Sequence, residues 1–201
     1  MAIADLLTSI AEKIQRVYAL KDNKPYINSL EITDYRYFNQ EGKRTAILEK
    51  LDTSNGTNFY YFCNSATDLV EVDLDFSKAT QMYGAFRGCT ALTTVENLNL
   101  SKVTGDSNFS NVFYNCSALK KVSVIANTIK RNISFSYSPL LTLESAKSIL
   151  LGLYNYAGNY YEFSFTITFH ADTWTLLDND GTTAPDGLTW REYVNSIGWN
   201  A

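Results

Sequence analysis

The sequence LDFSKATQMYGAFRGCTAL, residues 74–92, recurs along this chain in altered form. A second copy reads LNLSKVT at 98–104 and FYNCSAL at 113–119, and an earlier, partial copy begins with LDTSNGT at 51–57. After its last leucine each copy continues with a short run in which apolar residues tend to alternate: VEVDL, TVENLNL or KVSVI. Repeats of roughly 20–30 residues are typical of solenoids, whose units stack to share one core. We therefore predict an α/β solenoid over residues 51–138.

The alternating run of each copy is expected to be a β-strand, because successive side chains of a strand point to opposite faces. One face would hold the apolar residues, and the other would hold polar residues that differ from copy to copy. These outward positions form the candidate recognition surface: Glu71, Asp73, Thr94, Glu96, Lys121 and Ser123.

The residues that recur are expected to form the scaffold. Large aromatic side chains suit the core of a thin solenoid, so we expect Phe62, Phe86 and Phe113 to be buried. A Ser-x-x-Thr element follows each expected strand, and its hydroxyls are expected to hold the corner by bonding nearby backbone amides. These elements are Ser54/Thr57, Ser77/Thr80 and Ser101/Thr104.

The chain has three cysteines, Cys63, Cys89 and Cys116, and an odd number cannot pair completely within one chain. Cys89 and Cys116 occupy the same place in their copies, which favours small buried thiols in the reduced state. A zinc site would require further ligands at close spacing, and the single histidine, His170, is distant in sequence. No metal or cofactor is therefore expected.

The first residues predict a helix over 4–20. Its apolar residues are spaced alternately four and three apart, which is a heptad seam, and isoleucine at both seam positions favours trimers or larger bundles. The alternative is an amphipathic helix that packs on its own domain. The stretch KDNKP, residues 21–25, ends the helix, and residues 26–50 are assigned as the N-terminal cap of the solenoid. The seam comprises Ile3, Leu7, Ile10, Ile14 and Val17.

The last part of the chain, residues 139–201, is expected to form a helix–strand cap. Residues 125–139 resemble a weakened fourth copy without the cysteine. Residues 141–158 predict a helix with Thr142 as N-cap, and 162–170 alternate strictly and predict a strand. A further short helix is expected around Trp190.

Composition and motif searches argue against several classes of function. The net charge of −4 disfavours nucleic acid as a partner, and no run of about 18 apolar residues predicts a membrane span. The N-terminus lacks the features of a secretory signal, which predicts folding in a cytoplasm. No phosphate-loop, zinc-protease or serine-hydrolase motif occurs, and the DNDG at 178–181 does not fit a calcium loop. We therefore expect a protein that is not an enzyme.

Tyrosine is abundant, with 14 residues, and one cluster stands near the C-terminus: Tyr154, Tyr156, Tyr160 and Tyr161. Exposed aromatic clusters can stack on sugars or anchor protein contacts. The alternative is that these tyrosines are buried in the C-terminal cap.

The motifs SKATQMYGAFRGCTALTTV and SKVT with NVFYNCSALKKV resemble the BspA-type leucine-rich-repeat family, over about residues 35–138. The first copy departs from that pattern because its cysteine is displaced. The flanks, including LTLESAKSILLGLYNYAG and LTWREYVNSIGW, look like those of leucine-rich-repeat proteins from tailed phages and prophages.

The resemblance implies adhesion or recognition. It suggests a virion protein, such as a tail fibre, head fibre, spike or decoration subunit, made in the host cytoplasm. Its partners would be other virion proteins, through the N-terminal helix, and a host cell-surface protein or glycan. A homo-oligomer, preferably a trimer, is expected, without nucleic acid and without membrane insertion. The alternative is a bacterial surface adhesin or interaction module of leucine-rich-repeat type.

Overall fold

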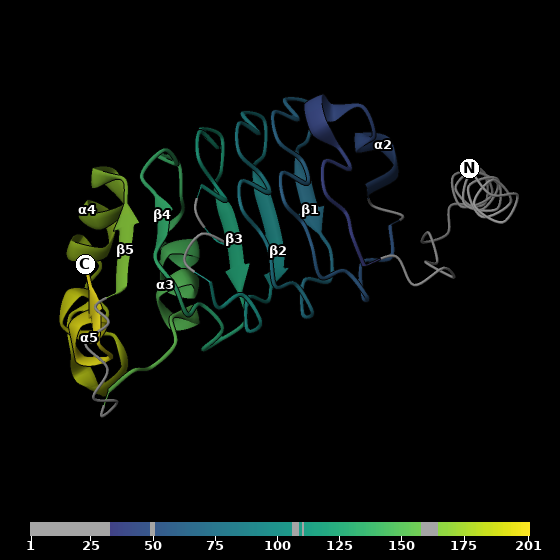
Figure 1. Ribbon diagram of the computed structural model, residues 1–201. Helices are drawn as coiled ribbons and strands as arrows, with labels where there is room; N and C mark the ends of the chain where they lie inside the picture. The colour runs from purple at the N-terminus through teal and green to yellow at the C-terminus, as the bar shows by residue number, and fades with distance from the viewer. Residues whose placement is uncertain (1–32, 49–50, 106–108, 110, 158–164) are drawn as a thin grey trace, which may run out of the picture.

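The computed structural model describes residues 33–48, 51–105, 109, 111–157 and 165–201. Within these residues the chain has a mixed α/β fold, in which small parallel sheets run along the molecule and helices lie towards its ends (Figure 1). The predicted helix over 4–20, with its seam, lies outside the described residues. No described helix is long and apolar enough to cross a membrane.

The first sheet contains β1 (Glu71–Asp73), β2 (Thr94–Leu98) and β3 (Lys121–Val124), in that order and all parallel. Val72, Val95 and Val122 lie in register and are buried, as the alternation predicts. Because consecutive strands are parallel, the chain must return to the same end between them. Successive turns therefore lie side by side (Figure 1).

The return run of each turn supplies aromatic side chains to the core. Phe62, Phe86 and Phe113 are buried as predicted. The ring of Phe113 stacks on Phe86, with centroids 5.7 Å apart, and on Phe135, with centroids 5.0 Å apart. A continuous row of phenylalanines thus joins one turn to the next.

The three thiols are free and buried, in agreement with the prediction of reduced core cysteines. The thiol of Cys89 donates to the carbonyl oxygen of Cys63 at 2.9 Å, and that of Cys116 donates to Phe86 at 3.1 Å. The backbone N–H of Cys63 bonds to the carbonyl of Ala85, which aligns Cys63 with Phe86. In the first turn the cysteine therefore stands where later turns have phenylalanine.

The corners after the strands are held by acidic and amide side chains, which corrects the prediction for the Ser-x-x-Thr elements. Asp75 accepts the backbone N–H of Ser77 at 2.8 Å. The same bond is made by Asp52 to Ser54 and by Asn99 to Ser101. Asp and Asn side chains make this local turn more strongly than hydroxyls do. The hydroxyl of Thr80 instead donates to the carbonyl of Thr57, one turn earlier, at 3.1 Å.

The fourth turn keeps the spacing of the repeat with serine in place of cysteine. Phe135, Ser138 and Leu141 are all buried, and Ser138 donates to the carbonyl of Cys116 at 3.2 Å. Helix α3 (Leu143–Gly152) then follows in place of a strand, with Thr142 as its N-cap, as predicted. The helix ends at Gly152 and not near Gly158, because Leu153 is extended and bridges to Ile129.

The second sheet contains β4 (Ile133–Phe135), β5 (Phe165–Phe169) and β6 (Trp199–Asn200), also parallel and in that order. The strand expected over 162–170 and the helix expected around Trp190, α5 (Trp190–Ser196), are present. Helix α4 (Ala171–Asn179) was not anticipated, and the His170 side chain caps it by accepting the N–H of Asp172. The remaining short elements are η1 (Gln40–Gly42), α2 (Thr45–Leu48) and η3 (Pro185–Gly187).

Candidate functional site

The six predicted outward residues come together on one face of the first sheet. Glu71, Thr94 and Lys121 lie in register and form one row across the three strands. Asp73 lies beside Glu96 in the next row. Ser123, on β3, bonds to Glu96 and completes that row. We call these six residues the strand face.

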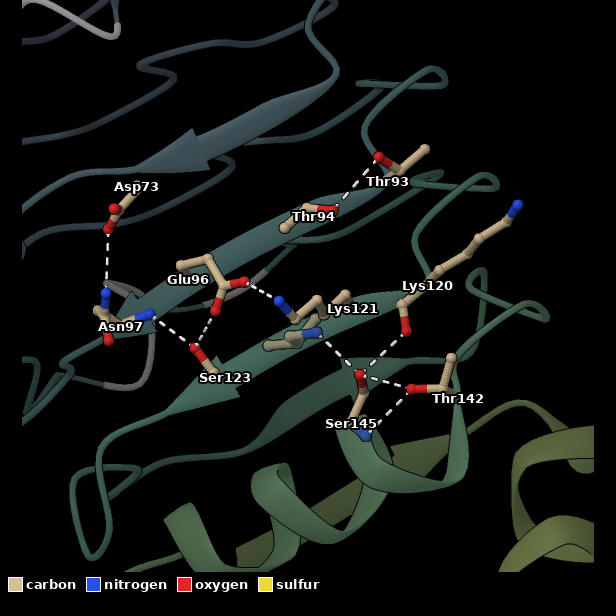
Figure 2. Close-up of polar contacts among 11 residues, drawn as sticks. Asp73, Thr93, Thr94, Glu96, Asn97, Lys120, Lys121, Ser123, Thr142 and Ser145 are labelled. Carbon is tan, nitrogen blue, oxygen red and sulfur yellow. Dashed lines mark hydrogen bonds and ion pairs between the residues drawn. The ribbon is translucent and has the colours of Figure 1, made fainter.

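Four residues of the strand face, Asp73, Glu96, Lys121 and Ser123, belong to one network of polar contacts (Figure 2). Glu96 pairs with the ammonium group of Lys121 and accepts a hydrogen bond from Ser123 at 2.6 Å. The Ser123 oxygen in turn accepts the backbone N–H of Asn97 at 2.8 Å, and the Asn97 side chain donates to Asp73 at 3.1 Å. Hydrogen bonds from Lys121 and then Ser123 lower the pKa of Glu96. These contacts hold the face in a fixed arrangement.

Asn97 belongs to this network although its side chain was not among the predicted site residues. It sits in a bulge, where β2 has one residue more than β3 between the pairs Val95–Val122 and Leu98–Val124. Its φ of 54° is in the left-handed region, which asparagine tolerates better than most residues do. The sequence signal is the extra residue in VENL relative to VSV.

A hollow of about 570 Å³ borders the strand face along β1. Glu71 and Asp73 line it together with Asp68, Thr45 and the short helix α2. The hydroxyl of Thr45 donates to the carboxylate of Asp68 at 3.0 Å. This side of the face is therefore recessed and carries negative charge.

Helix α3 lies along the opposite edge of the sheet, next to β3. The Ser145 hydroxyl oxygen accepts the backbone N–H of Val122 at 3.0 Å, and Ser148 accepts that of Val124 at 3.0 Å. Ser145 also donates to the carbonyl of Lys120 at 3.0 Å, as Figure 2 shows. The edge of β3 thus bonds to side chains of the same chain, which blocks pairing with another strand there.

A second cluster of side chains lies on the return runs and consists of tyrosines, of which Tyr37 is exposed and the other three are half-buried. Tyr60 stacks on Tyr83 with centroids 5.3 Å apart, and Tyr37 stacks on Tyr61 with centroids 5.9 Å apart. The two stacks touch, because Tyr60 and Tyr61 are 4.6 Å apart at a steep angle. A Cβ on Gly84 would meet the Tyr61 ring at 2.5 Å, so glycine makes room for this ring. We call Tyr37, Tyr60, Tyr61 and Tyr83 the tyrosine cluster.

The aromatic surface continues beyond the tyrosine cluster. The guanidinium group of Arg87 lies 5.4 Å from the centre of the Tyr114 ring, and Tyr114 lies 4.5 Å from Tyr137. Partial burial and then neighbouring phenols raise the pKa of Tyr60, which keeps this ring neutral. Sequence reasoning missed these residues. For the tyrosine cluster a signal was present, because Tyr37, Tyr60 and Tyr83 recur at a regular spacing in the sequence.

The tyrosines that the sequence singled out lie elsewhere. Tyr154 and Tyr156 are 4.9 Å apart, and Tyr156 packs against Phe165 and Trp199 of the second sheet. Tyr160 and Tyr161 lie outside the described residues. Of the described half of that cluster, Tyr156 packs against the core.

The groups that could perform other chemistry are engaged or buried. Burial raises the pKa of Cys89 to about 12 and raises those of Cys63 and Cys116 as well, so the thiols are poor nucleophiles. Asp180, in the DNDG turn, forms an ion pair with Lys147 of α3 at 2.6 Å. Among the residues that the structure describes, no cluster of three or more His, Cys, Asp or Glu could hold a metal ion.

No protein-family model, curated protein or solved structure matches this chain. The argument for a function therefore rests on the residues and contacts described above.

Proposed function

We propose that this chain is a non-enzymatic structural protein of a phage virion, a fibre, spike or decoration subunit that recognises a host surface. In this proposal residues 51–138 form a short leucine-rich-repeat-like solenoid. Residues 26–50 and 139–201 cap its two ends. The strand face is the recognition surface, and it contacts a protein or glycan of the host cell.

The arrangement of the strand face carries the proposal. Its side chains change from strand to strand, whereas the inward residues Val72, Val95 and Val122 repeat. A scaffold that repeats and a surface that varies are the features expected of a recognition module built from repeats. The bonds among Asp73, Asn97, Ser123 and Glu96 also lower the entropy lost on binding, because the surface is already ordered.

The polar groups of this face favour binding over catalysis. A pair of catalytic carboxylates needs different environments, one of which keeps an acid protonated near neutral pH. Glu96 is in the opposite situation, because Lys121 and Ser123 stabilise its charged form. Asp73 accepts a hydrogen bond from the Asn97 side chain, which fixes its position. Glu96 is therefore suited to fixed, ionised contacts with a partner.

Cell binding by the full chain tests this function. The double variant Glu71→Ala and Thr94→Ala removes one exposed and one half-buried group of the strand face. The matched control, Glu144→Ala and Thr175→Ala, removes the same groups from α3 and α4. We expect binding of labelled protein to host cells to weaken at least tenfold in the first variant only. Equal binding by both variants would exclude the strand face as the recognition surface.

The N-terminal helix is proposed to join three copies and to anchor them to other virion proteins. Charged residues at the seam would oppose such an assembly. We expect Ile10→Asp with Ile14→Asp to convert a trimer to a monomer in light scattering, with an unchanged near-ultraviolet circular dichroism signal from Trp174, Trp190 and Trp199. A monomeric unmodified chain would remove this part of the proposal.

A further inference from the structure

We propose that two residues of the tyrosine cluster, Tyr37 and Tyr60, bind a neutral glycan in a hollow that they form with Arg36, Asn58 and Gln81. This inference rests on the proposed recognition function. It adds a second surface, on the return runs, and it assigns that surface a class of ligand. The strand face would then be free to make different contacts.

The hollow has the size of a small-ligand site, and its lining is aromatic and polar. Its volume is about 310 Å³, at the lower end of the range for ligand pockets. Its lining residues come from three segments of the chain: Arg36 with Tyr37, Asn58 with Tyr60, and Gln81. Asn58 pairs directly with Gln81. None of its five lining residues is aliphatic.

The aromatic walls suit a ligand with both apolar faces and hydroxyl groups. The rings of Tyr37 and Tyr60 are 5.6 Å apart and inclined at 78°, so they form a corner. Tyr37 is 47% exposed, which leaves ring surface for a ligand. The ring C–H groups of a sugar can pack on one phenol ring while its hydroxyls bond to the phenol oxygens.

The polar groups of the hollow are fixed by bonds within the chain. The Asn58 side-chain oxygen accepts the N–H of Tyr60 at 3.2 Å, so its amide nitrogen is the group that can donate to a ligand hydroxyl. Gln81 is held in the same way, by the N–H of Tyr83 at 2.8 Å. Fixed amides recognise hydroxyl groups without the cost of ordering side chains.

The charge of the hollow favours a neutral ligand. Arg36 forms an ion pair with Asp34 at 2.8 Å, and its Nε contacts both carboxylate oxygens at 2.9 and 3.0 Å. The guanidinium charge is therefore compensated within the chain. An acidic sugar or a phosphate would have to compete with Asp34 for Arg36, whereas a neutral sugar would not.

An array of neutral and acidic oligosaccharides, probed with the labelled full chain, tests the inference. We expect binding to neutral glycans, weakened roughly tenfold by Tyr37→Ala, since a lost aromatic contact costs about one factor of ten. Tyr137→Ala is the matched control, because Tyr137 is 48% exposed and lies outside the hollow. Tyr37→Phe should retain most binding. In the unmodified chain, NMR signals of the Tyr37 and Tyr60 rings should shift on titration with the neutral glycan that binds.

Three results would overturn the inference: binding to acidic glycans or to a protein only, equal loss in Tyr37→Ala and Tyr137→Ala, or ring signals that do not shift. Each leaves the proposed recognition function intact if cells still bind through the strand face. If the strand-face variant loses cell binding, the proposed function is supported. If, in the same experiments, neither the unmodified chain nor any variant binds a glycan, this inference is rejected.

Discussion

The hydroxyl oxygen of Ser145, on helix α3, accepts the backbone N–H of Val122, on β3, at 3.0 Å. Ser148 makes the equivalent contact with Val124. An edge strand normally presents unpaired N–H and C=O groups, which invite pairing with other chains. Here helix α3 lies beside β3, the last strand of the sheet, and its serines supply hydrogen bonds that a further strand would have made.

Replacement of Ser145 by alanine should destabilise the protein. The change would leave the buried N–H of Val122 without an acceptor, at a cost of about 1–3 kcal/mol in the free energy of unfolding. Ser117→Ala, at an exposed position, should change it by no more than about 0.5 kcal/mol. Urea denaturation measures both. Equal stability of the two variants would mean that the Ser145 contact contributes nothing.

The row of phenylalanines predicts a large difference between two neighbouring aromatic residues. Phe113 is buried between Phe86 and Phe135, whereas Tyr114 is 38% exposed. Phe113→Ala should cost about 3–5 kcal/mol, because it leaves a cavity in the core. Tyr114→Ala should cost about 1 kcal/mol, the scale of its contacts with Arg87 and Tyr137. Similar melting temperatures for both variants would contradict a core at Phe113.

The thiols should be unreactive in the folded protein. Cys63, Cys89 and Cys116 are buried, and burial raises the pKa of each. A thiol reagent should modify all three only at the rate of unfolding, and rapidly in denaturant. Cys116→Ser should be tolerated better than Cys116→Val, since Ser138 already occupies the equivalent place in the next turn. Fast labelling of the native protein would refute this placement.

The ion pair between Lys147 and Asp180 predicts an acid dependence of stability. Lys147 and then Thr182 lower the pKa of Asp180 below its usual value of 3.8. Because the pKa of Asp180 is lower in the folded than in the unfolded protein, the charged carboxylate stabilises the fold at pH values above the unfolded-state pKa. This stabilisation is lost as the pH falls through the folded-state pKa. Lys147→Met should therefore be less stable than the unmodified chain at neutral pH, and the difference should shrink in acid.

The control for this experiment is Lys102→Met, at an exposed position. Its stability should follow that of the unmodified chain at every pH. A difference between Lys147→Met and the unmodified chain that does not depend on pH would show that the ammonium group acts by packing alone. Lys147 also lies 5.9 Å from the Trp190 ring centre, which provides that alternative contact.

The parts of the fold that depend on repetition could be predicted from the sequence. Phe, Cys and Leu of the second and third copies are buried because both copies place them at the same inward positions. The outward alternation of the strands was predictable for the same reason, and it identified six residues that do share one face. The helix that starts after Thr142 was visible from its N-cap and apolar stripe.

The parts that depend on contacts between turns could not be predicted. Spacing alone does not show that Ser145 and Ser148 point at β3, because a serine on a helix is usually solvated. When the copies are aligned by residue type, Phe62 corresponds to Phe86. The backbone hydrogen bonds between the turns show that Cys63 is the residue that lies beside Phe86. The stacking within the tyrosine cluster could not be predicted, because Tyr37 meets Tyr61 and Tyr60 meets Tyr83 only when turns stack.

Purified phage particles from a strain that carries this gene provide the most direct measurement. We expect mass spectrometry to detect the chain in intact particles at a fixed copy number that is a multiple of three. Antibodies against the strand face should label the outer surface of the particle in electron micrographs. Absence of the chain from particles, with labelling of the bacterial cell surface instead, would contradict a virion protein and favour an adhesin.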